Sequence, residues 1–507
     1  MVSQNVNGRA LSAASFLCGA CVMVLEMAGS RVMAPYMGTS LVVWTSLIGI
    51  IMVSLTLGYW LGGRVADKRP EKKILYYIIL AAALVTAIVG AIATPVLDAL
   101  SEGVRNVYAA SVMASAVLFA VPSVLLGMVS PFIVRLAMNN VISSGGTVGK
   151  FSALSSAGSI IGTFLGGFVL ISFFSSGTIL FMVAFVLALV ALILRGGKAV
   201  LPVIAAVFAA ACGFYFESAD IEREAKFMET AEISGEITVE THYNTIKIME
   251  RAANGTNLRI RILQTDPLGA QSLMYVDRPD DLYSDYTKYS DRAFPYKQDA
   301  KNILMLGGGG YCVPKHIGAT RPDVAVDVVE LDPGITDVAR KYFNLTDRPG
   351  QRIFHEDARM FVNRESEAGA RKYDAVFEDV FGSSYNIPFH MTTAECMAKI
   401  RAMMSDDGVF VINIISSLDG ELFSGIYASV ASAFPTVMIY PATSPNSIRA
   451  RQNIMIVALA NENEPYRAAG DDYTASLLSH RWTNFFEPKI AAFTDAFAPV
   501  EKYSLSL

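Results

Sequence analysis

Cysteine and histidine are scarce in this chain of 507 residues, which contains five of each. No group of them has the spacing of zinc ligands, so the sequence predicts no bound metal. Cys18 and Cys21 have CxxC spacing, but they lie inside a long apolar run. Small buried side chains explain that pair better than a redox or metal site does.

Acidic residues are nearly missing from the first part of the chain. Residues 1–216 contain twelve Lys and Arg but only five Asp and Glu, a net charge of +7, whereas residues 217–507 carry −12. The acidic second part would be repelled by phosphate, which argues against a nucleic-acid partner. No charged segment precedes a short apolar core at the N-terminus, so no cleavable signal peptide is expected.

Long apolar runs, in contrast, fill residues 1–216. A helix of about 20 apolar residues is long enough to cross a lipid bilayer. Seven such spans are expected, at residues 10–35, 41–62, 74–98, 107–135, 152–174, 177–195 and 199–216. The sequence therefore predicts a multi-pass α-helical membrane domain over residues 1–216, with the lipid bilayer as its partner.

Basic residues gather at one end of these predicted helices. They follow the second span (Arg64 to Lys73), the fourth (Arg135) and the sixth (Arg195 and Lys198). Because positive residues favour the cytoplasmic side, these connections and the N-terminus are expected in the cytoplasm. Seven spans would then place residue 217 outside.

Two charged residues, Glu26 and Arg31, fall inside the first predicted span. A charge within the membrane is costly and often marks a substrate path. A charge pair that stabilises the helix bundle is the alternative. Both interpretations stay open, and the functional one predicts a transporter or sensor.

The region over residues 217–295 is predicted to be a linker and a small antiparallel β domain. Residues 236–240, 245–249 and 258–262 have the alternating pattern of strands, and Asn254-Gly255 is typical of a hairpin turn.

A nucleotide-binding pattern begins at Asn302. A short apolar strand, residues 302–306, ends in the glycines Gly307 to Gly310, and a helix with Pro314 in its first turn follows. The next strand ends in Glu330, twenty positions after Gly310. In this arrangement the glycines allow the backbone to approach the ligand, and the acid accepts from ribose hydroxyls.

Further acids follow the later strands of this region. Asp357 follows a third strand, and Glu378 and Asp379 end a fourth strand at residues 373–377. Later strands are expected at residues 409–415, 437–440 and 454–458. Ligands bind at the carboxyl ends of such strands, so the sequence predicts a Rossmann-like methyltransferase-fold domain over residues 296–460. It would bind an S-adenosyl sulfonium compound with Asp379 at the reacting centre, and residues 461–507 would form a C-terminal extension.

The residues after Asp379 carry a family resemblance. They include Ser383, Ser384, Ile387-Pro388-Phe389-His390 and Thr392-Thr393. With the glycines and acids, they resemble the spermidine synthase family of polyamine aminopropyltransferases, in the bacterial branch whose catalytic domain follows a membrane bundle. The resemblance covers about residues 235–460 and extends to Phe493-Thr494-Asp495 and Ala498-Pro499-Val500-Glu501.

The resemblance implies roles for the matched residues. The co-substrate would be decarboxylated S-adenosylmethionine or S-adenosylmethionine. Gly307, Gly308 and Gly309 would line this compound. Glu330 would bind its ribose, and Asp357 with Ala358 would contact its adenine. Asp379 would orient and deprotonate the attacking amine. The residues expected on the amine side are Tyr286, Tyr243, Glu378 and His390. A small-molecule amine as substrate, a homodimer and a bacterial inner-membrane location also follow from the resemblance.

Two acids of the family pattern are missing, at Gly310 and Gly382. Both serve cationic amines in the family, and Glu378 or Asp419 are candidates to replace them. Three functions therefore stay open: an aminopropyltransferase, a methyltransferase or lyase acting on S-adenosylmethionine, and a transporter or sensor with a cofactor-binding domain. S-adenosyl compounds are made in the cytoplasm, so either residues 199–216 do not cross the membrane or the compound reaches the far side.

Overall fold

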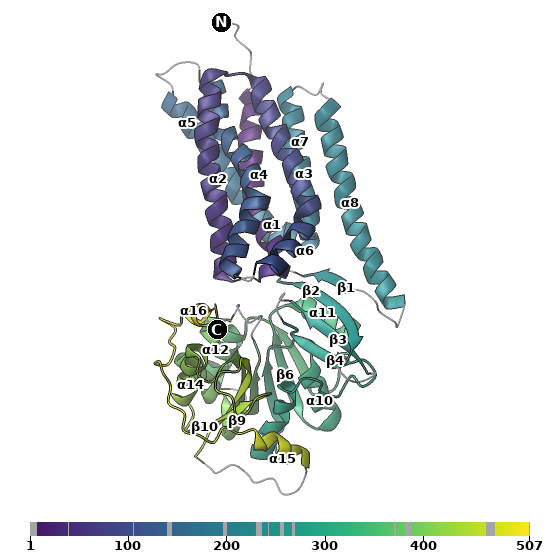
Figure 1. Ribbon diagram of the computed structural model, residues 1–507, viewed down its shortest axis with the longest axis vertical. Helices are drawn as coiled ribbons and strands as arrows, with labels where there is room; N and C mark the ends of the chain where they lie inside the picture. The colour runs from purple at the N-terminus through teal and green to yellow at the C-terminus, as the bar shows by residue number, and fades with distance from the viewer. Residues whose placement is uncertain are drawn as a thin grey trace. The chain divides into compact units, whose positions relative to one another are not determined.

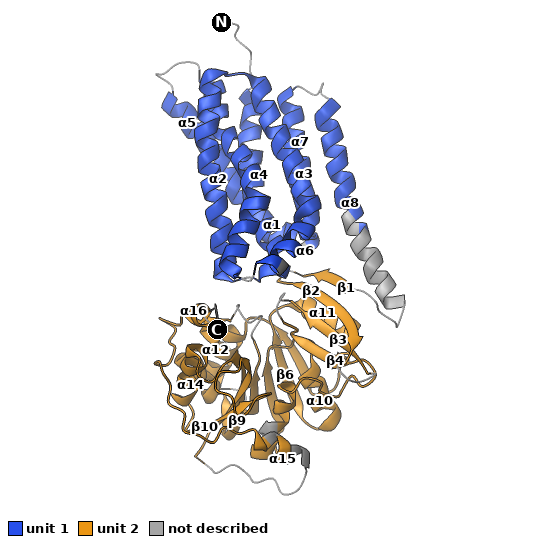
Figure 2. Cartoon of the chain, in the orientation of Figure 1, with its two compact units in different colours: residues 1–231 blue, residues 232–507 orange. Residues whose placement is uncertain are grey.

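The computed structural model describes residues 8–505 except 39, 105, 139–143, 196–199, 230–235, 242, 254–257, 266–268, 370–371, 381–386 and 463–471. The chain divides into two compact units, residues 1–231 and 232–507 (Figure 2). The first unit is helical, and the second contains all the described strands (Figure 1).

Long apolar helices form the first unit. They are α1 (Gly8–Met37), α2 (Leu41–Lys68), α3 (Lys72–Gly103), α4 (Val107–Ala137), α5 (Ser144–Phe164) with a π-helical continuation (Leu165–Leu170), α6 (Ile171–Phe173), α7 (Ser176–Arg195) and α8 (Val200–Glu229). Small residues allow close packing between them. A β-carbon on Gly158 of α5 would lie 1.9 Å from the carbonyl oxygen of Phe16 on α1.

Six helices in the described residues are long and apolar enough to cross a membrane, and α8 is not among them. Among the described side chains of α8 the apolar stretch is Val200–Tyr215, so the seventh span, expected at residues 199–216, stays a prediction. Beyond that stretch the helix continues to Glu229 through a charged sequence, past residue 216 where we expected the helical domain to end.

A small antiparallel sheet opens the second unit, as predicted. Its strands follow the order β1 (Glu236–Glu240), β2 (Thr245–Ala252), β3 (Arg259–Gln264) and β4 (Ser272–Tyr275). Ile246, Ile248, Ile260 and Ile262 alternate with polar residues and are buried, which explains the alternation in the sequence. The expected Asn254-Gly255 turn lies outside the described residues.

The large sheet of the second unit has seven strands in the order β10-β11-β9-β8-β5-β6-β7. Their bounds are β5 (Asn302–Leu306), β6 (Ala325–Glu330), β7 (Gln351–His355), β8 (Tyr373–Glu378), β9 (Met404–Ser416), β10 (Thr436–Pro441) and β11 (Gln452–Leu459). Strands β5 to β9 pair with one another in parallel, and β11 is antiparallel to both β9 and β10. This is the predicted methyltransferase-type architecture.

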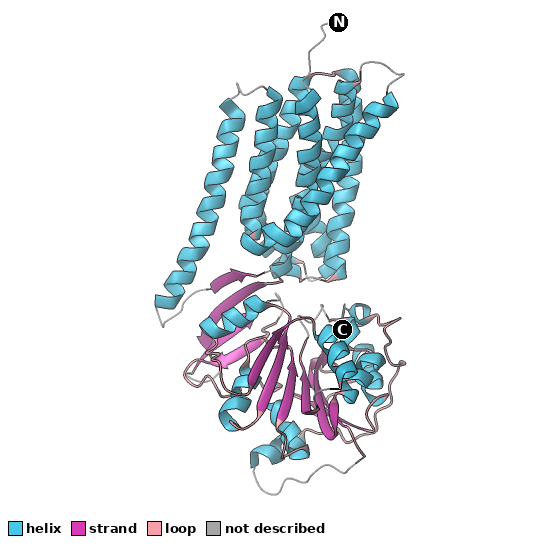
Figure 3. Cartoon of the chain, turned by 180° about the vertical axis from the view of Figure 1, so that it is seen from behind, coloured by secondary structure: helices cyan, strands magenta, loops and turns pink. Residues whose placement is uncertain are grey.

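Helices flank this sheet (Figure 3). They are α9 (Ala293–Tyr296), α10 (Cys312–Thr320), α11 (Pro333–Tyr342), α12 (Ala358–Ala368), α13 (Ala394–Ala402), α14 (Glu421–Ala431), α15 (Asp472–Ser479) and α16 (Val500–Leu505), with 3-10 helices η2 (Thr287–Arg292) and η3 (Phe389–Met391). Strands β5, β6, β8 and the later part of β9 are mostly apolar and buried, as expected for strands covered by helices. The residues that end or directly follow β5 to β8 therefore gather at the carboxyl ends of the parallel strands.

Candidate active site

The ends of β5 and β8 approach each other closely at Gly307. Its φ of +92° is a conformation that favours glycine, and a β-carbon there would lie 2.2 Å from the carbonyl oxygen of Asp379. The Asp379 N–H donates to the carbonyl of Leu306 at 2.9 Å, which ties the two strand ends together. The glycine and the acid singled out in the sequence thus form one backbone junction.

Two adjacent acids, Glu378 and Asp379, occupy the end of β8. Asn413 on β9 donates from Nδ2 to Asp379 Oδ1 at 3.0 Å. Burial raises the pKa of Asp379 to about 6, and the hydrogen bond from Asn413 partly offsets that effect. The carboxylate is therefore poised to exchange a proton near neutral pH.

Glu378 is buried, with 1% of its surface exposed, and neither carboxylate oxygen has a hydrogen-bond partner among the described residues. Burial, together with the charge of Asp379, raises its pKa well above the ordinary value. A protonated Glu378 is the form that this environment favours.

Tyr286 faces the same place. With Glu378, Asp379 and Asn413 it lines a cavity of about 20 Å³, which is room for about one water molecule. The Tyr286 hydroxyl donates to the Gln271 carbonyl at 2.9 Å. Burial and the neighbouring Asp379 raise its pKa, so the phenol stays protonated. The cavity therefore brings the fixed Tyr286 hydroxyl close to one amide and two carboxyl groups.

Replacing Glu378 with glutamine is expected to raise the melting temperature at pH 8 but not at pH 4.5. The folded-state pKa lies above the unfolded one, so the carboxyl destabilises the fold only once the pH exceeds the unfolded pKa. Glutamine is neutral at both pH values, so it removes only the cost linked to ionisation of the carboxyl, and each kcal/mol removed shifts the melting temperature of a unit of this size by about 2–4 °C. Thermal unfolding of the detergent-solubilised chain measures the shift.

Glu250 provides the matched control for that substitution. Its side chain is nearly as buried, with 3% exposed. In contrast to Glu378, it pairs with Arg261 through Oε1 and lies 3.6 Å from Arg259 through Oε2. Glu250→Gln should therefore lower the melting temperature at pH 8. An equal rise for Glu378→Gln at both pH values would mean that packing, not ionisation, decides its effect.

Glu330 at the end of β6 holds the glycine loop in this structure. One oxygen accepts from the N–H groups of Gly308 and Gly309 at 2.9 and 3.1 Å, and the other accepts from Asp332 at 2.9 Å. Burial raises the pKa of Glu330, and these three donors partly offset it. These backbone donors fix the acid beside the glycine loop, and Oε1, which accepts a single hydrogen bond, can accept from one further donor.

The glycine at position 310 stands where the family pattern has an aspartate, and the space around it is closed. A β-carbon there would lie 2.8 Å from the Ser272 Cβ and 3.0 Å from the Phe343 Cδ1. The Gly310 N–H donates to Ser272 Oγ at 2.8 Å. An acidic side chain at this position would push against Ser272 at the start of β4. The close packing around Gly310 therefore excludes an acid here.

Asp357 and His390 form a separate pair at the end of β7. Asp357 caps α12 by accepting from the Met360 N–H at 3.0 Å, and its other oxygen lies 3.5 Å from His390 Nε2. The hydrogen bond with His390 holds the pKa of Asp357 below its ordinary value. Ala358 packs against the apolar core as the first residue of α12.

The C-terminal segment is fastened next to that pair. Arg359 donates to both oxygens of Asp495, at 3.0 and 2.6 Å, and Thr393 donates to the same carboxylate at 2.6 Å. Arg359 also donates to the His390 carbonyl. The Thr-Asp segment noted in the sequence therefore anchors α12 and α13 from one side.

The structure brings some predicted site residues together and separates others. Gly307, Glu378, Asp379 and Tyr286 meet at one place, whereas His390 pairs with Asp357. Tyr243 is 43% exposed and does not line that cavity. Its neighbour Asn244 instead donates to Asp332 at 2.9 Å, linking the small sheet to the start of α11. Gly382, Ser383 and Ser384 lie outside the described residues.

Two contributors to the site escaped the sequence analysis. Asn413 is the single amide in an apolar run of β9, and that interruption is a signal that could have identified it. Ser272 offers no such signal, because its contact with Gly310 joins residues 38 positions apart.

Comparison with known proteins shows a family match over this part of the chain. Residues 293–466 match the family model of the spermine/spermidine synthase domain. The chain is 28% identical over 245 residues to a polyamine aminopropyltransferase of Vibrio vulnificus, which covers 45% of this chain and 79% of that protein. It is also 28% identical over 190 residues to a probable polyamine aminopropyl transferase of Bifidobacterium longum, covering 37% of this chain but only 40% of that protein.

Methyltransferases are also similar to part of the chain. An N-terminal histidine N-methyltransferase of Emericella nidulans is 30% identical over 147 residues, which is 29% of this chain and 25% of that protein. Among solved structures, a probable spermidine synthase from Corynebacterium glutamicum superposes with a TM-score of 0.42 and 19% identity, over 53% of this chain and 99% of that one.

Proposed function

We propose, from the premise that residues 293–466 belong to the spermine/spermidine synthase domain family, that this chain is a membrane-bound aminopropyltransferase. It would transfer the aminopropyl group of decarboxylated S-adenosylmethionine to an amine. The observation that carries the proposal is the Asp379 carboxylate, held by Asn413 beside Gly307, with a pKa raised to about 6.

The chemistry assigned to Asp379 is positioning and proton transfer. The amine nitrogen attacks the carbon bound to the sulfonium, the new C–N bond forms as the C–S bond breaks, and a neutral thioether leaves. The nitrogen must be free of its proton before attack and loses another afterwards. A carboxylate with a raised pKa can hold the ammonium and accept that proton, while alignment of the two reactants supplies most of the rate.

Tyr286 and Glu378 form the rest of the amine side in this proposal. The tyrosine hydroxyl is held by the Gln271 carbonyl and stands in the cavity beside Asp379. Glu378 is the acid available to accept a cationic substrate where the family's acids at positions 310 and 382 are missing. An ammonium that reaches Glu378 would ionise it and form the pair that its buried oxygens lack.

Gly307, Gly308 and Gly309 are proposed to line the donor, with Glu330 at its ribose and Asp357 and Ala358 at its adenine. In this proposal the six apolar helices cross the membrane and α8 does not, so both ends of the six-helix segment lie on one side. If the basic connections are cytoplasmic, residues 232–507 face the compartment where S-adenosyl compounds are made.

One assay tests the proposed reaction. Purified protein is given decarboxylated or ordinary S-adenosylmethionine, with and without putrescine, and the products are identified by mass spectrometry. Methylthioadenosine formed only from the decarboxylated donor with an amine is the expected result. No product from that pair would overturn the proposal.

The absence of an acid at Gly310 favours a second function. An acid there would repel the carboxylate of ordinary S-adenosylmethionine, and the packing around Gly310 leaves no room for one. The site is therefore also compatible with ordinary S-adenosylmethionine, as in a methyltransferase or a lyase. The same assay separates these reactions, because a methyltransferase releases S-adenosylhomocysteine and a lyase releases methylthioadenosine without an amine.

The pH dependence of the reaction should follow Asp379. Because the carboxylate is the active form and its pKa is about 6, kcat/KM is expected to fall about tenfold per pH unit below pH 6. Initial rates between pH 5 and 8 with saturating donor measure the profile. An Asn413→Ala variant loses the hydrogen bond that lowers this pKa, so its inflection should move to higher pH. An unchanged inflection would assign the titration to another group.

A further inference from the structure

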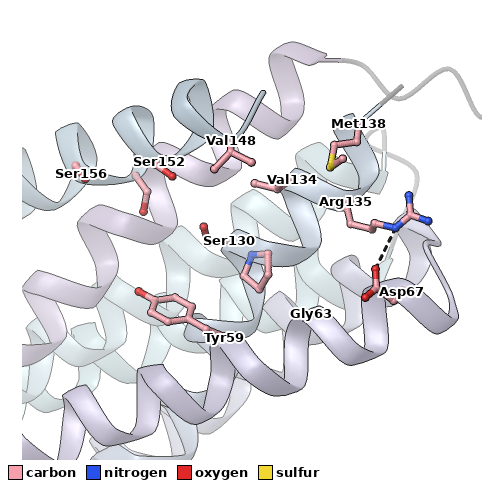
Figure 4. Close-up of a pocket in the computed structure, with 12 residues that line it drawn as sticks. Tyr59, Gly63, Asp67, Ser130, Val134, Arg135, Met138, Val148, Ser152 and Ser156 are labelled. Carbon is pink, nitrogen blue, oxygen red and sulfur yellow. Dashed lines mark hydrogen bonds and ion pairs between the residues drawn. The ribbon is translucent and has the colours of Figure 1, made fainter. Parts of the chain in front are cut away.

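A larger cavity lies within the helical unit, between α2, α4 and α5 (Figure 4). Its volume of about 570 Å³ falls in the range of small-molecule sites, roughly 300–1,000 Å³. Tyr59 and Asp67 line it from α2, and Arg135 lines it from α4. Asp67 and Arg135 lie in the last turns of their helices, so this ion pair marks the end of the cavity next to the basic connections.

The cavity is lined by serine hydroxyls that have no protein partner. Ser130 comes from α4, and Ser152, Ser155 and Ser156 come from α5. None of these four hydroxyls makes a hydrogen bond within the described part of the chain. Ser152 and Ser156 are exposed and Ser130 and Ser155 are half-buried, so these hydroxyls are accessible to a polar occupant of the cavity.

Several other hydroxyls of the same unit are satisfied within their own helices, whereas those of Ser40, Ser111 and Ser123 also have no partner in the described part of the chain. Ser46, Ser54 and Thr86 each donate to the carbonyl four residues earlier, at 2.8, 2.7 and 2.8 Å. That local bond is the usual way in which a helix satisfies a serine or threonine. The cavity serines depart from this pattern, which leaves their donors and acceptors available to a ligand.

The charges of the cavity cancel. Asp67 and Arg135 are its only residues charged at pH 7, and they pair with each other, Nε to Oδ1, at 3.2 Å. A polyamine would find no unpaired carboxylate there, and the connection from Arg64 to Lys73 next to it is strongly basic. Because Arg135 is already paired with Asp67, the lining offers a small anion no unpaired cation either.

We infer that this cavity binds an uncharged, hydroxyl-bearing small molecule of nucleoside size. Hydroxyls of α4 and α5 can donate to and accept from a sugar diol. The Tyr59 ring, 51% exposed, offers an aromatic face on which a heterocycle can stack. Neither requirement is met by a lipid tail or a polyamine.

The proposed reaction releases a molecule of this class. Aminopropyl transfer leaves methylthioadenosine, an uncharged nucleoside thioether, and this choice of nucleoside rests on the proposed function. The ligand class itself rests on the lining of the cavity. Glu26 and Arg31, which we considered for a substrate path, do not line it.

The test is equilibrium binding of labelled methylthioadenosine to the full chain in phosphatidylcholine nanodiscs. Excess decarboxylated S-adenosylmethionine, a cation, is added to occupy the soluble site. Saturable binding is expected to remain, and spermidine should not compete for it. A Ser152→Ala/Ser156→Ala variant should bind about tenfold more weakly, since two hydrogen bonds are lost.

Ser46→Ala is the matched control, because it removes a hydroxyl that is satisfied within α2. Its binding should be unchanged. Absence of saturable binding, competition by spermidine, or full binding by the double serine variant would each overturn the inference. Aminopropyl transfer is measured on the same samples, so normal transfer with no binding rejects only this inference, and binding without transfer rejects only the proposed function.

Discussion

Replacing Asp379 with asparagine is expected to abolish aminopropyl transfer while leaving donor binding unchanged. Asparagine has nearly the same shape, and its side-chain oxygen can still accept from Asn413. It cannot accept the proton of the amine or balance its charge. Loss of such a base lowers turnover by about 10²–10⁴-fold. Single-turnover product formation measures the first effect, and equilibrium binding of the donor measures the second.

Asp374 on the same strand is the control for that substitution. It accepts from the N–H groups of Lys301 and Asn302, at 2.8 and 3.0 Å, at the opposite end of β8 from Asp379. Asp374→Asn should therefore keep its turnover. Full turnover by Asp379→Asn would remove this residue from the chemistry, and joint loss of binding and turnover would mean that it holds the fold or the donor.

Replacing Gly307 with alanine is expected to disable the site through the backbone. The residue has a φ of +92°, and the new methyl group would meet the Asp379 carbonyl at 2.2 Å. Such strain costs about 1–3 kcal/mol, and its relief must move the end of β8 away from β5. We expect donor affinity and turnover to fall together by at least about tenfold, since a 1.4 kcal/mol loss is already tenfold.

Gly369→Ala is the control that separates the steric clash of a new methyl group from the strain of a positive φ. Gly369 also has a positive φ, +58°, but no atom lies within 4 Å of its β-carbon position. It ends α12 as a C-cap, so alanine there should cost stability with no effect on turnover. If Gly307→Ala and Gly369→Ala lower turnover equally, the contact between Gly307 and Asp379 has no special role.

The sequence alone predicted the order of elements because their signals are local. Apolar runs of membrane length, alternation in β1 to β3, and a strand ending in glycines followed by a strand ending in an acid are read from neighbouring residues. The seven-stranded sheet follows from these elements and the preference for parallel crossovers. The meeting of Gly307 with Asp379 was also predictable, since parallel strands end at one edge.

The tertiary structure decided which side chains touch and which groups are buried. Asn413 reaches Asp379 across 34 positions, and Arg359 reaches Asp495 across 136. No local pattern encodes such contacts. No local pattern predicts that Glu378 is buried without a partner or that His390 pairs with Asp357. The hydroxyl-lined cavity between α2, α4 and α5 is likewise not encoded in any local pattern. Each depends on the packing of elements far apart in the chain, because burial and pairing are properties of the packed structure and not of the residue type.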